Sequence, residues 1–170
     1  MRELAAATLA GLVRATEDDS FLHHVRRVSL DKATTLQASA KRARQHKRQQ
    51  ARAVAAGNGN GGGVDGGGAT DCNAGSSVAE PTLAQRHGPI LGLVALVQSS
   101  PYSVPAWLPE VVSRLAGAAS EPPPIRDTVT KALAEFKKTH HDTWAATREA
   151  FSEQQWEMLT DLAVSPSYFV

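Results

Sequence analysis

Residues 87–97 restrict the possible folds most, because they form a segment that is apolar nearly all round. They read His-Gly-Pro-Ile-Leu-Gly-Leu-Val-Ala-Leu-Val and include no acidic residue, Lys or Arg. A helix at the surface would show a polar face, so this pattern predicts a helix that is buried on most sides. Gly88 and Gly92 lie about one helical turn apart and would let another chain segment approach closely. The segment therefore needs several helical neighbours.

The following residues predict one such neighbour, joined to the first helix by a short turn. Pro101 ends the first helix, since proline disfavours helical geometry at the residue before it. The second helix ends near Gly117. It has an apolar stripe at helical spacing, formed by Leu108, Val111, Val112 and Leu115. The two helices predict an αα-hairpin. Because one hairpin cannot bury both of its faces, we expect further helices stacked on it.

Two helices are predicted before this hairpin. The first covers about residues 2–15, and its apolar side consists of Ala5, Leu9, Leu12 and Val13. It has no cap or lead-in, which is expected of a start inside a longer helical array. The second begins at Asp18-Asp19-Ser20, and its apolar side consists of Phe21, Leu22, Val25 and Val28. We expect this helix to break near Ser29-Leu30-Asp31 and to resume to about residue 55.

Two further helices are predicted after the hairpin. One covers about residues 125–140, with an inner face formed by Ile125, Val129, Ala132, Leu133 and Phe136. The last begins at Ser152, which forms a capping box with Gln155, while Phe151 and Trp156 occupy the two staple positions. Its inner face consists of Trp156, Leu159 and Leu162. It should end near residue 164, because Pro166 restricts the residue before it.

The composition agrees with an all-α fold of antiparallel helix pairs. Helix formers dominate, strand-like alternation is almost absent, and 42% hydrophobic residues suffice for a core. Residues 57–68 hold eight of the thirteen glycines, which predicts a disordered insertion. We therefore expect a helical segment at 1–55, a disordered Gly-rich insertion at 56–80, helices at 81–165 and a short extended tail at 166–170.

The sequence favours neither an enzyme nor a membrane protein. It contains no nucleophile-elbow, dinucleotide-binding or zinc-protease motif, and we expect no cofactor and no small-molecule substrate. Adjacent helical residues point about 100° apart, so neither His23-His24 nor His140-His141-Asp142 is expected to bind a metal. The single cysteine, Cys72, excludes an internal disulfide and suits a reducing compartment. The longest apolar run, residues 90–97, is too short to span a bilayer.

A basic run lies in the second predicted helix. It consists of Lys41, Arg42, Arg44, Lys47, Arg48 and Arg52, and no acidic residue occurs between Lys32 and Val64. One interpretation is a solvated, cation-rich helix end, which the helix dipole favours. The alternative is a patch that contacts phosphates or directs the chain to the nucleus. No aromatic residues interleave with the run, which argues against stacking on bases. The net charge of +1 gives no global attraction to nucleic acid or anionic membrane.

The last five residues, Pro166-Ser-Tyr-Phe-Val170, form an unusually apolar chain end. Chain ends are normally polar and frayed. No Lys or Arg follows Arg148, so no nearby cation in the sequence neutralises the terminal carboxylate. The tail either packs back on its own core or inserts into a partner's pocket. In such a pocket the rings would be buried and a lysine would capture the carboxylate.

Several of these segments together resemble one known family. They are residues 87–97, Pro101-Tyr-Ser-Val-Pro-Ala-Trp-Leu-Pro109, Phe136-Lys-Lys-Thr-His140, Asp142-Thr-Trp144, and Phe151 to Leu162 leading to the tail. The combination is similar to the C-terminal end of the large HEAT-repeat proteasome activators, the family of proteasome activator complex subunit four and its yeast counterpart. The likeness covers about residues 81–170. Residues 2–14 resemble a repeat helix of that family more weakly.

The resemblance implies a HEAT/ARM-like α-solenoid that caps the 20S proteasome core. In that family the C-terminal tail enters a pocket between α-subunits and helps to open the gate, so Tyr168, Phe169 and Val170 are the expected docking residues. Phe169 stands where the family has tyrosine, and the missing hydroxyl is worth about 0.5–1.5 kcal/mol. Docking should therefore survive better than gate opening. The resemblance also implies action in the nucleus and cytoplasm, ubiquitin-independent degradation of peptides and proteins, acetylated histones among them, and a link to DNA repair.

Two other functions remain open from the residues alone. One is a generic helical-repeat scaffold whose tail packs on itself. The other is a histone or nucleic-acid adaptor that uses the basic run.

Overall fold

The computed structural model describes residues 2–16, 18–57 and 80–163, and over these residues the chain is built from helices and contains no strand. The elements in chain order are α1 (Arg2–Ala15), α2 (Asp19–Gly57), α3 (Leu83–Ser99), α4 (Leu108–Gly117), the 3-10 helix η1 (Ala118–Ser120), α5 (Ile125–Thr139), α6 (Trp144–Glu149) and α7 (Glu153–Ala163). The all-α prediction is thus confirmed. The predicted tail at 166–170 and residues 58–79 of the predicted insertion lie outside the described residues.

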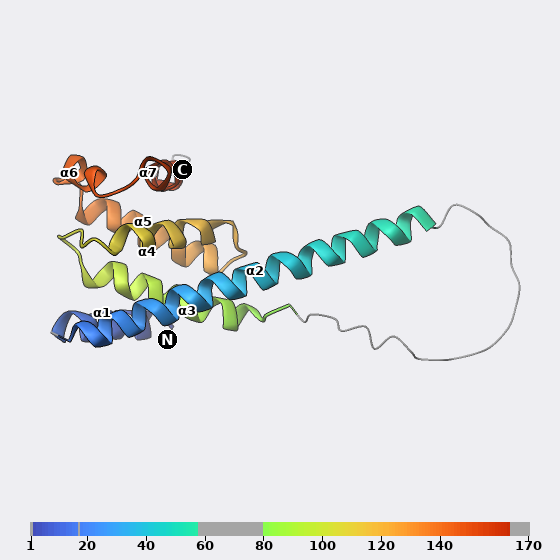
Figure 1. Ribbon diagram of the computed structural model, residues 1–170, viewed down its shortest axis with the longest axis horizontal. Coiled ribbons are helices and arrows are strands. Elements are labelled where there is room, and N and C mark those ends of the chain that lie inside the picture. The colour runs from blue at the N-terminus through green and yellow to red at the C-terminus, as the bar shows by residue number, and fades with distance from the viewer. Residues whose placement is uncertain (1, 17, 58–79, 164–170) are drawn as a thin grey trace, which may run out of the picture.

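The helices are stacked in layers (Figure 1). Helices α1 and α2 pack on α3, helices α4 and α5 pack on α3 from its other side, and α7 lies across α4 and α5. Helix α3 is therefore central, as its all-round apolar sequence predicts. Its residues Ile90, Leu93 and Leu96 are no more than 1% exposed.

The predicted inner faces of α4 and α5 are confirmed. All four stripe residues of α4 and all five of α5 are buried in the same core as the apolar residues of α3. Helix α3 ends at Ser99, α4 at Gly117 and α5 at Thr139, close to the predicted positions. The apolar stripes of α4 and α5 predicted the buried faces correctly, because each of these helices buries a single side.

The predicted break near Ser29-Leu30-Asp31 is wrong, because α2 runs continuously from Asp19 to Gly57. Ser29 is 7% exposed, and its side chain faces Gly92 of α3. Ala33, one turn further on, is buried in the core. The small side chain of Ser29 therefore fits a close contact between two helices and does not interrupt α2. The same contact confirms that Gly92 allows a close approach.

The predicted apolar side of α1 is only partly correct. Val13 is buried and Leu9 is partly buried, but Ala5 is exposed and Leu12 is 54% exposed. The line that packs on α3 consists instead of Ala6, Ala10 and Val13. Small alanines let α1 lie close to α3 around Ala95, and this closeness rotates the larger Leu12 outward.

Two local features of the chain were not predicted. Helix α3 begins four residues before the predicted segment, because Thr82 and Gln85 form a reciprocal capping box. The short helix α6 lies between α5 and α7, after His140. It ends just before Phe151 and brings Trp144 to the outer layer.

Candidate functional site

The predicted docking residues Tyr168, Phe169 and Val170 lie outside the described residues, so the structure shows the helix that leads to them. That helix, α7, is capped as predicted. The Ser152 backbone N–H donates to Gln155 Oε1 over 3.0 Å, and the Gln155 backbone N–H donates to Ser152 Oγ over 3.4 Å. Leu159 is fully buried, and Trp156 and Leu162 pack against the core. The last helix is therefore fixed to the body on its inner side.

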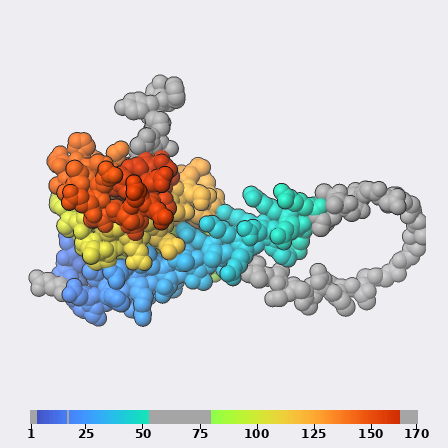
Figure 2. Space-filling view, turned by 45° about the horizontal axis from the view of Figure 1, so that its top comes forward, coloured from blue at the N-terminus to red at the C-terminus, as the bar shows by residue number. Residues whose placement is uncertain are grey.

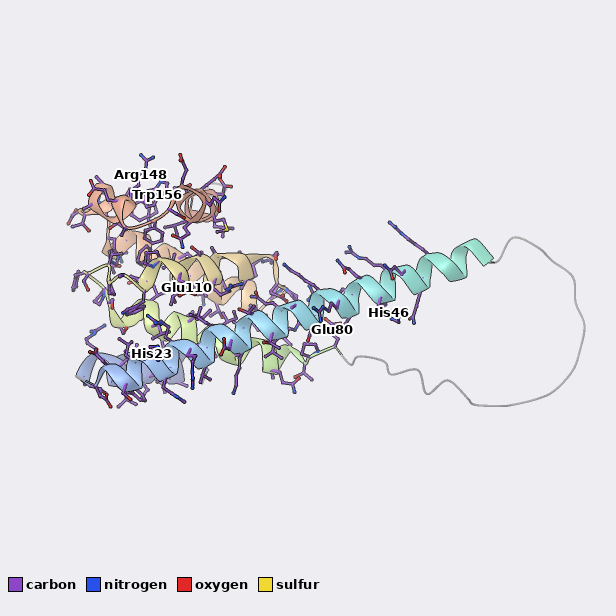
Figure 3. The ribbon with its side chains drawn as sticks, in the orientation of Figure 1. His23, His46, Glu80, Glu110, Arg148 and Trp156 are labelled. Atoms are coloured by element: carbon purple, nitrogen blue, oxygen red, sulfur yellow. The ribbon has the colours of Figure 1, made fainter. Side chains whose placement is uncertain are left out.

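A cluster of aromatic rings fixes the start of α7. Phe151 and Trp156 are in edge contact with ring centroids 6.0 Å apart, as their staple positions predict. Trp156 also lies 4.8 Å from Trp144 of α6, and Phe151 lies 6.3 Å from Phe136 of α5. Figure 3 labels Trp156 in this outer layer. The cluster joins α5, α6 and α7 into one unit next to the residues that precede the tail.

The exposed face of α7 carries negative charge. Glu153, Glu157 and Asp161 follow one another at four-residue spacing, and all three are exposed. Arg148 of α6 is the last cation of the sequence. A partner that approaches this end of the chain therefore meets an acidic surface, which favours a partner with lysine or arginine side chains.

The basic run is divided by the structure. Lys41, Arg42, Lys47, Arg48 and Arg52 are exposed on α2, but Arg44 is drawn into contacts with two glutamates. Figure 2 shows the C-terminal end of α2 extending beyond the packed body. The five exposed cations thus form a separate surface, well away from α7 in Figure 1.

A four-residue ion cluster joins α2 to the body. Glu121 is 5% exposed, and its Oε2 lies 2.5 Å from Arg86 Nη1 and 3.1 Å from Arg44 Nη2. Glu80, at the edge, lies 3.3 Å from Arg44 Nε and 3.7 Å from Arg86 Nη2. Two arginines share the buried carboxylate of Glu121, and Glu80 supplies the second negative charge, so the four charges of the cluster balance. Sequence reasoning missed this cluster, since its members come from three separate segments.

The histidine pairs do not converge. His23 and His24 are both exposed on α2, whereas His140 is 1% exposed and the neighbouring His141 is exposed. The buried His140 ring stacks on Phe136 at 4.3 Å, and its Nδ1 lies 3.0 Å from the Phe136 carbonyl oxygen. Within the described part of the chain, no group of three or more His, Cys, Asp or Glu residues could hold a metal ion.

A groove of about 920 Å³ between α1, α2 and α3 was also not predicted. Leu9, Val25 and Leu91 are among its apolar lining residues, and His24, Asp31 and Lys32 are among its polar ones.

Among the helices that the structure describes, none has both the length and the apolar character to cross a membrane.

Comparison with known proteins agrees with the resemblance seen in the sequence. A family profile described as "Proteasome activator complex subunit 4-like, C-terminal" matches residues 83–170, just over half of the chain. The proteasome activator subunit 4 of Arabidopsis thaliana is 40% identical over 169 residues, covering 99% of this chain and 8% of that protein. The human proteasome activator complex subunit 4 is 42% identical over 97 residues, or 57% of this chain and 5% of that protein. The proteasome activator BLM10 of Saccharomyces cerevisiae is 33% identical over 75 residues, or 43% of this chain and 4% of that protein.

These relatives are named as activators of the proteasome, which is a regulatory role and not an enzymatic one. The chain spans less than a tenth of their length. The matched part begins with α3 and continues through α7 to the last residue. The chain therefore belongs to the proteasome activator complex subunit 4 family and corresponds to its C-terminal region.

Proposed function

We propose that this chain acts as the C-terminal part of a proteasome activator that binds the α-ring of the 20S core. Its tail, with Tyr168, Phe169 and Val170, docks in a pocket between two α-subunits and promotes gate opening. The observation that carries this proposal is the family match over residues 83–170, which includes the tail. The capped and packed helix α7 supports it, because a fixed helix holds the point from which the tail leaves the body.

The acidic face of α7 gives further support. A core subunit that captures the Val170 carboxylate needs a lysine or arginine, and Glu153, Glu157 and Asp161 attract the same kind of surface. A desolvated contact between carboxylate and lysine contributes roughly 1.5–3 kcal/mol. Burial of the Tyr168 and Phe169 rings in the pocket would add more, at about 25 cal/mol per Å².

Association costs offset much of this gain, so a lone tail should bind in the millimolar to high-micromolar range. A second attachment through other parts of a longer activator would raise the effective concentration of the tail at its pocket. Weak but tail-dependent binding is therefore the expected behaviour of these 170 residues alone.

The test is co-sedimentation of the chain with purified 20S particles. Deletion of Tyr168 to Val170, or amidation of Val170, should reduce the bound fraction strongly. The control is Tyr102→Ala, which removes a tyrosine from another part of the surface. Tyr102 follows the C-terminal end of α3 and is 83% exposed. Equal binding by the truncated and intact chains would exclude the docking tail and favour a tail that packs on its own core.

Gate opening is tested separately through Phe169. We expect Phe169→Tyr to raise peptide hydrolysis by the 20S core, because it restores the hydroxyl that the resemblance assigns to this position. Binding should change little, since one hydrogen bond is worth about 0.5–1.5 kcal/mol. An unchanged hydrolysis rate at equal occupancy would show that the hydroxyl has no part in gating.

The biological setting is part of the same proposal. Acetylated histones are the protein substrates proposed for the activated core, and the nucleus and cytoplasm are the proposed locations, with a role in DNA repair. Degradation of acetylated against unmodified histones by the core with the intact or truncated chain tests the substrate. Fractionation of cells that express a tagged chain tests the location.

A further inference from the structure

The outer end of α2, beyond Arg44, forms no ion pair or side-chain hydrogen bond with the other described residues. Helix α2 is 39 residues long, and Arg44 is its outermost residue in contact with the body, through the ion cluster. Every described side chain from Gln45 to Arg52 is exposed. Figures 1 and 2 show this part of α2 extending away from the other helices. We refer to residues 41–57 as the cationic arm.

The arm consists largely of helix-forming residues, but it lacks the side-chain contacts that stabilise an isolated helix. It has no acidic residue to pair with its cations at three- or four-residue spacing. It also lacks an apolar stripe in its described part, since residues 45–52 read Gln-His-Lys-Arg-Gln-Gln-Ala-Arg. The part of α2 beyond Arg44, residues 45–57, is no longer than the roughly 12–15 residues at which isolated helices are marginal in water, and like charges weaken it further. A polyanionic partner would remove this repulsion.

The cations surround much of the helix. At about 100° per residue, Arg48 and Arg52 lie within about 20° of Lys41, whereas Arg42 lies about 100° to one side and Lys47 about 120° to the other. A flat acidic protein surface could contact only one of these sides. A groove with negative charge on both walls could contact all of them.

The major groove of DNA provides such walls. It is about 12 Å wide and accepts a helix of about 10–12 Å diameter, with phosphates on both sides. The described side chains of the arm beyond Arg44 are all exposed, so a groove can approach this part of the helix from several sides. The ion cluster around Glu121 fixes the base of the arm and so its direction.

We propose that the cationic arm binds duplex DNA by lying in the major groove and contacting phosphates on both strands without sequence preference. Lys41, Arg42, Lys47, Arg48 and Arg52 make the contacts, and Arg44 does not, because Glu80 and Glu121 hold it. This inference is independent of the proteasome proposal, which rests on the other end of the chain.

The test is fluorescence anisotropy of the full 170-residue chain with a mixed-sequence duplex of about 20 base pairs. Five phosphate contacts predict a slope of log K against log salt of about −4.5, or roughly a 500-fold loss of affinity between about 50 and 200 mM salt. A polyglutamate chain of equal charge serves as the acidic protein probe and should bind at least tenfold more weakly than the duplex.

Two charge-matched variants locate the site. The arm variant replaces Lys47, Arg48 and Arg52 with glutamine. The control variant replaces Arg27, Lys138 and Arg148, three exposed cations elsewhere in the structure, with glutamine. The arm variant should lose more than tenfold in affinity and reduce the slope to about −1.8, while the control should stay within about threefold.

Circular dichroism checks that both variants keep their helices. The double variant Lys41→Gln with Arg42→Gln repeats the measurement of duplex affinity at the base of the arm. Added duplex should also increase the helical signal of the intact chain. The proposal is overturned if the arm and control variants lose equal affinity, if polyglutamate binds as tightly as the duplex, or if no duplex binding occurs at about 50 mM salt.

Discussion

Gly11 of α1 and Gly92 of α3 give a matched pair of substitutions with opposite expected signs. A Cβ added at Gly92 would lie inside contact distance of Ser29 Oγ and 3.2 Å from Ser29 Cβ. A Cβ added at Gly11 would meet no heavy atom within 4 Å. Both positions lie inside a helix, so Gly→Ala changes the helix propensity alike and only the contact with α2 differs.

The magnitudes follow from these two terms. Replacing glycine with alanine inside a helix stabilises it by about 0.8–1.0 kcal/mol. Forcing a methyl group into a packed interface costs about 1–3 kcal/mol. We therefore expect Gly11→Ala to stabilise the chain by about 1 kcal/mol and Gly92→Ala to destabilise it by about 1 kcal/mol. At about 2–4 °C per kcal/mol for a chain of this size, the two melting temperatures should differ by roughly 4–8 °C.

Thermal unfolding followed by far-UV circular dichroism measures this difference. The variant Ser29→Ala removes the hydroxyl that the new methyl group meets, so its combination with Gly92→Ala should recover most of the lost stability. The packing of α2 on α3 would be refuted if both glycine variants raised the melting temperature equally. Failure of Ser29→Ala to rescue Gly92→Ala would refute the specific contact.

Three further predictions concern the ion cluster and α7, each read from the free energy of unfolding in urea. Glu121→Gln should cost about 3 kcal/mol, because it leaves the 7% exposed Arg86 without its closest charge partner. Replacing the pair together, with Glu121→Leu and Arg86→Met, should restore most of that loss, and a double variant as unstable as the single one would contradict the cluster's energetics. Ser152→Ala should cost about 1 kcal/mol by removing the cap of α7, and no change would mean that the capping box is not formed in solution. Leu159→Ala should cost about 2–5 kcal/mol because this side chain is fully buried, whereas a loss below about 1 kcal/mol would mean that α7 is not packed.

The sequence was most informative where one face of a helix differs strongly from the others. Val111 and Val129 belong to stripes whose burial could be predicted, because their neighbours on other faces are polar. In α1 the alanines look alike from every side, so the pattern could not show that Ala6 packs and Ala5 does not. The apolar tail and its possible insertion into a partner's pocket came from the residues themselves, whereas docking on the 20S core came from the resemblance. The family profile extends over the tail to residue 170.

Other features depend on contacts that local sequence does not contain. Ser29-Leu30-Asp31 has the residue types of a helix start, and only the partner Gly92 explains why α2 continues through it. The ion cluster joins Arg44 to Glu121 across 77 positions of sequence, and no local pattern connects them. The capping box of Thr82 with Gln85 had a readable signal, since it matches the Ser/Thr-x-x-Glu/Gln pattern.

The aromatic cluster before the tail gives the chain a built-in optical reporter. Two of the chain's three tryptophans, Trp144 and Trp156, belong to this cluster, and their ring centroids lie 4.8 Å apart. Both side chains are only half-buried, so their emission responds to changes in solvent contact at this end of the molecule. Trp107, the third tryptophan of the chain, lies at the start of α4, outside this cluster. Replacing Trp107 with phenylalanine would leave an emission signal from the outer layer alone. Occupation of the surface around α7 could then be followed in real time without attaching a dye.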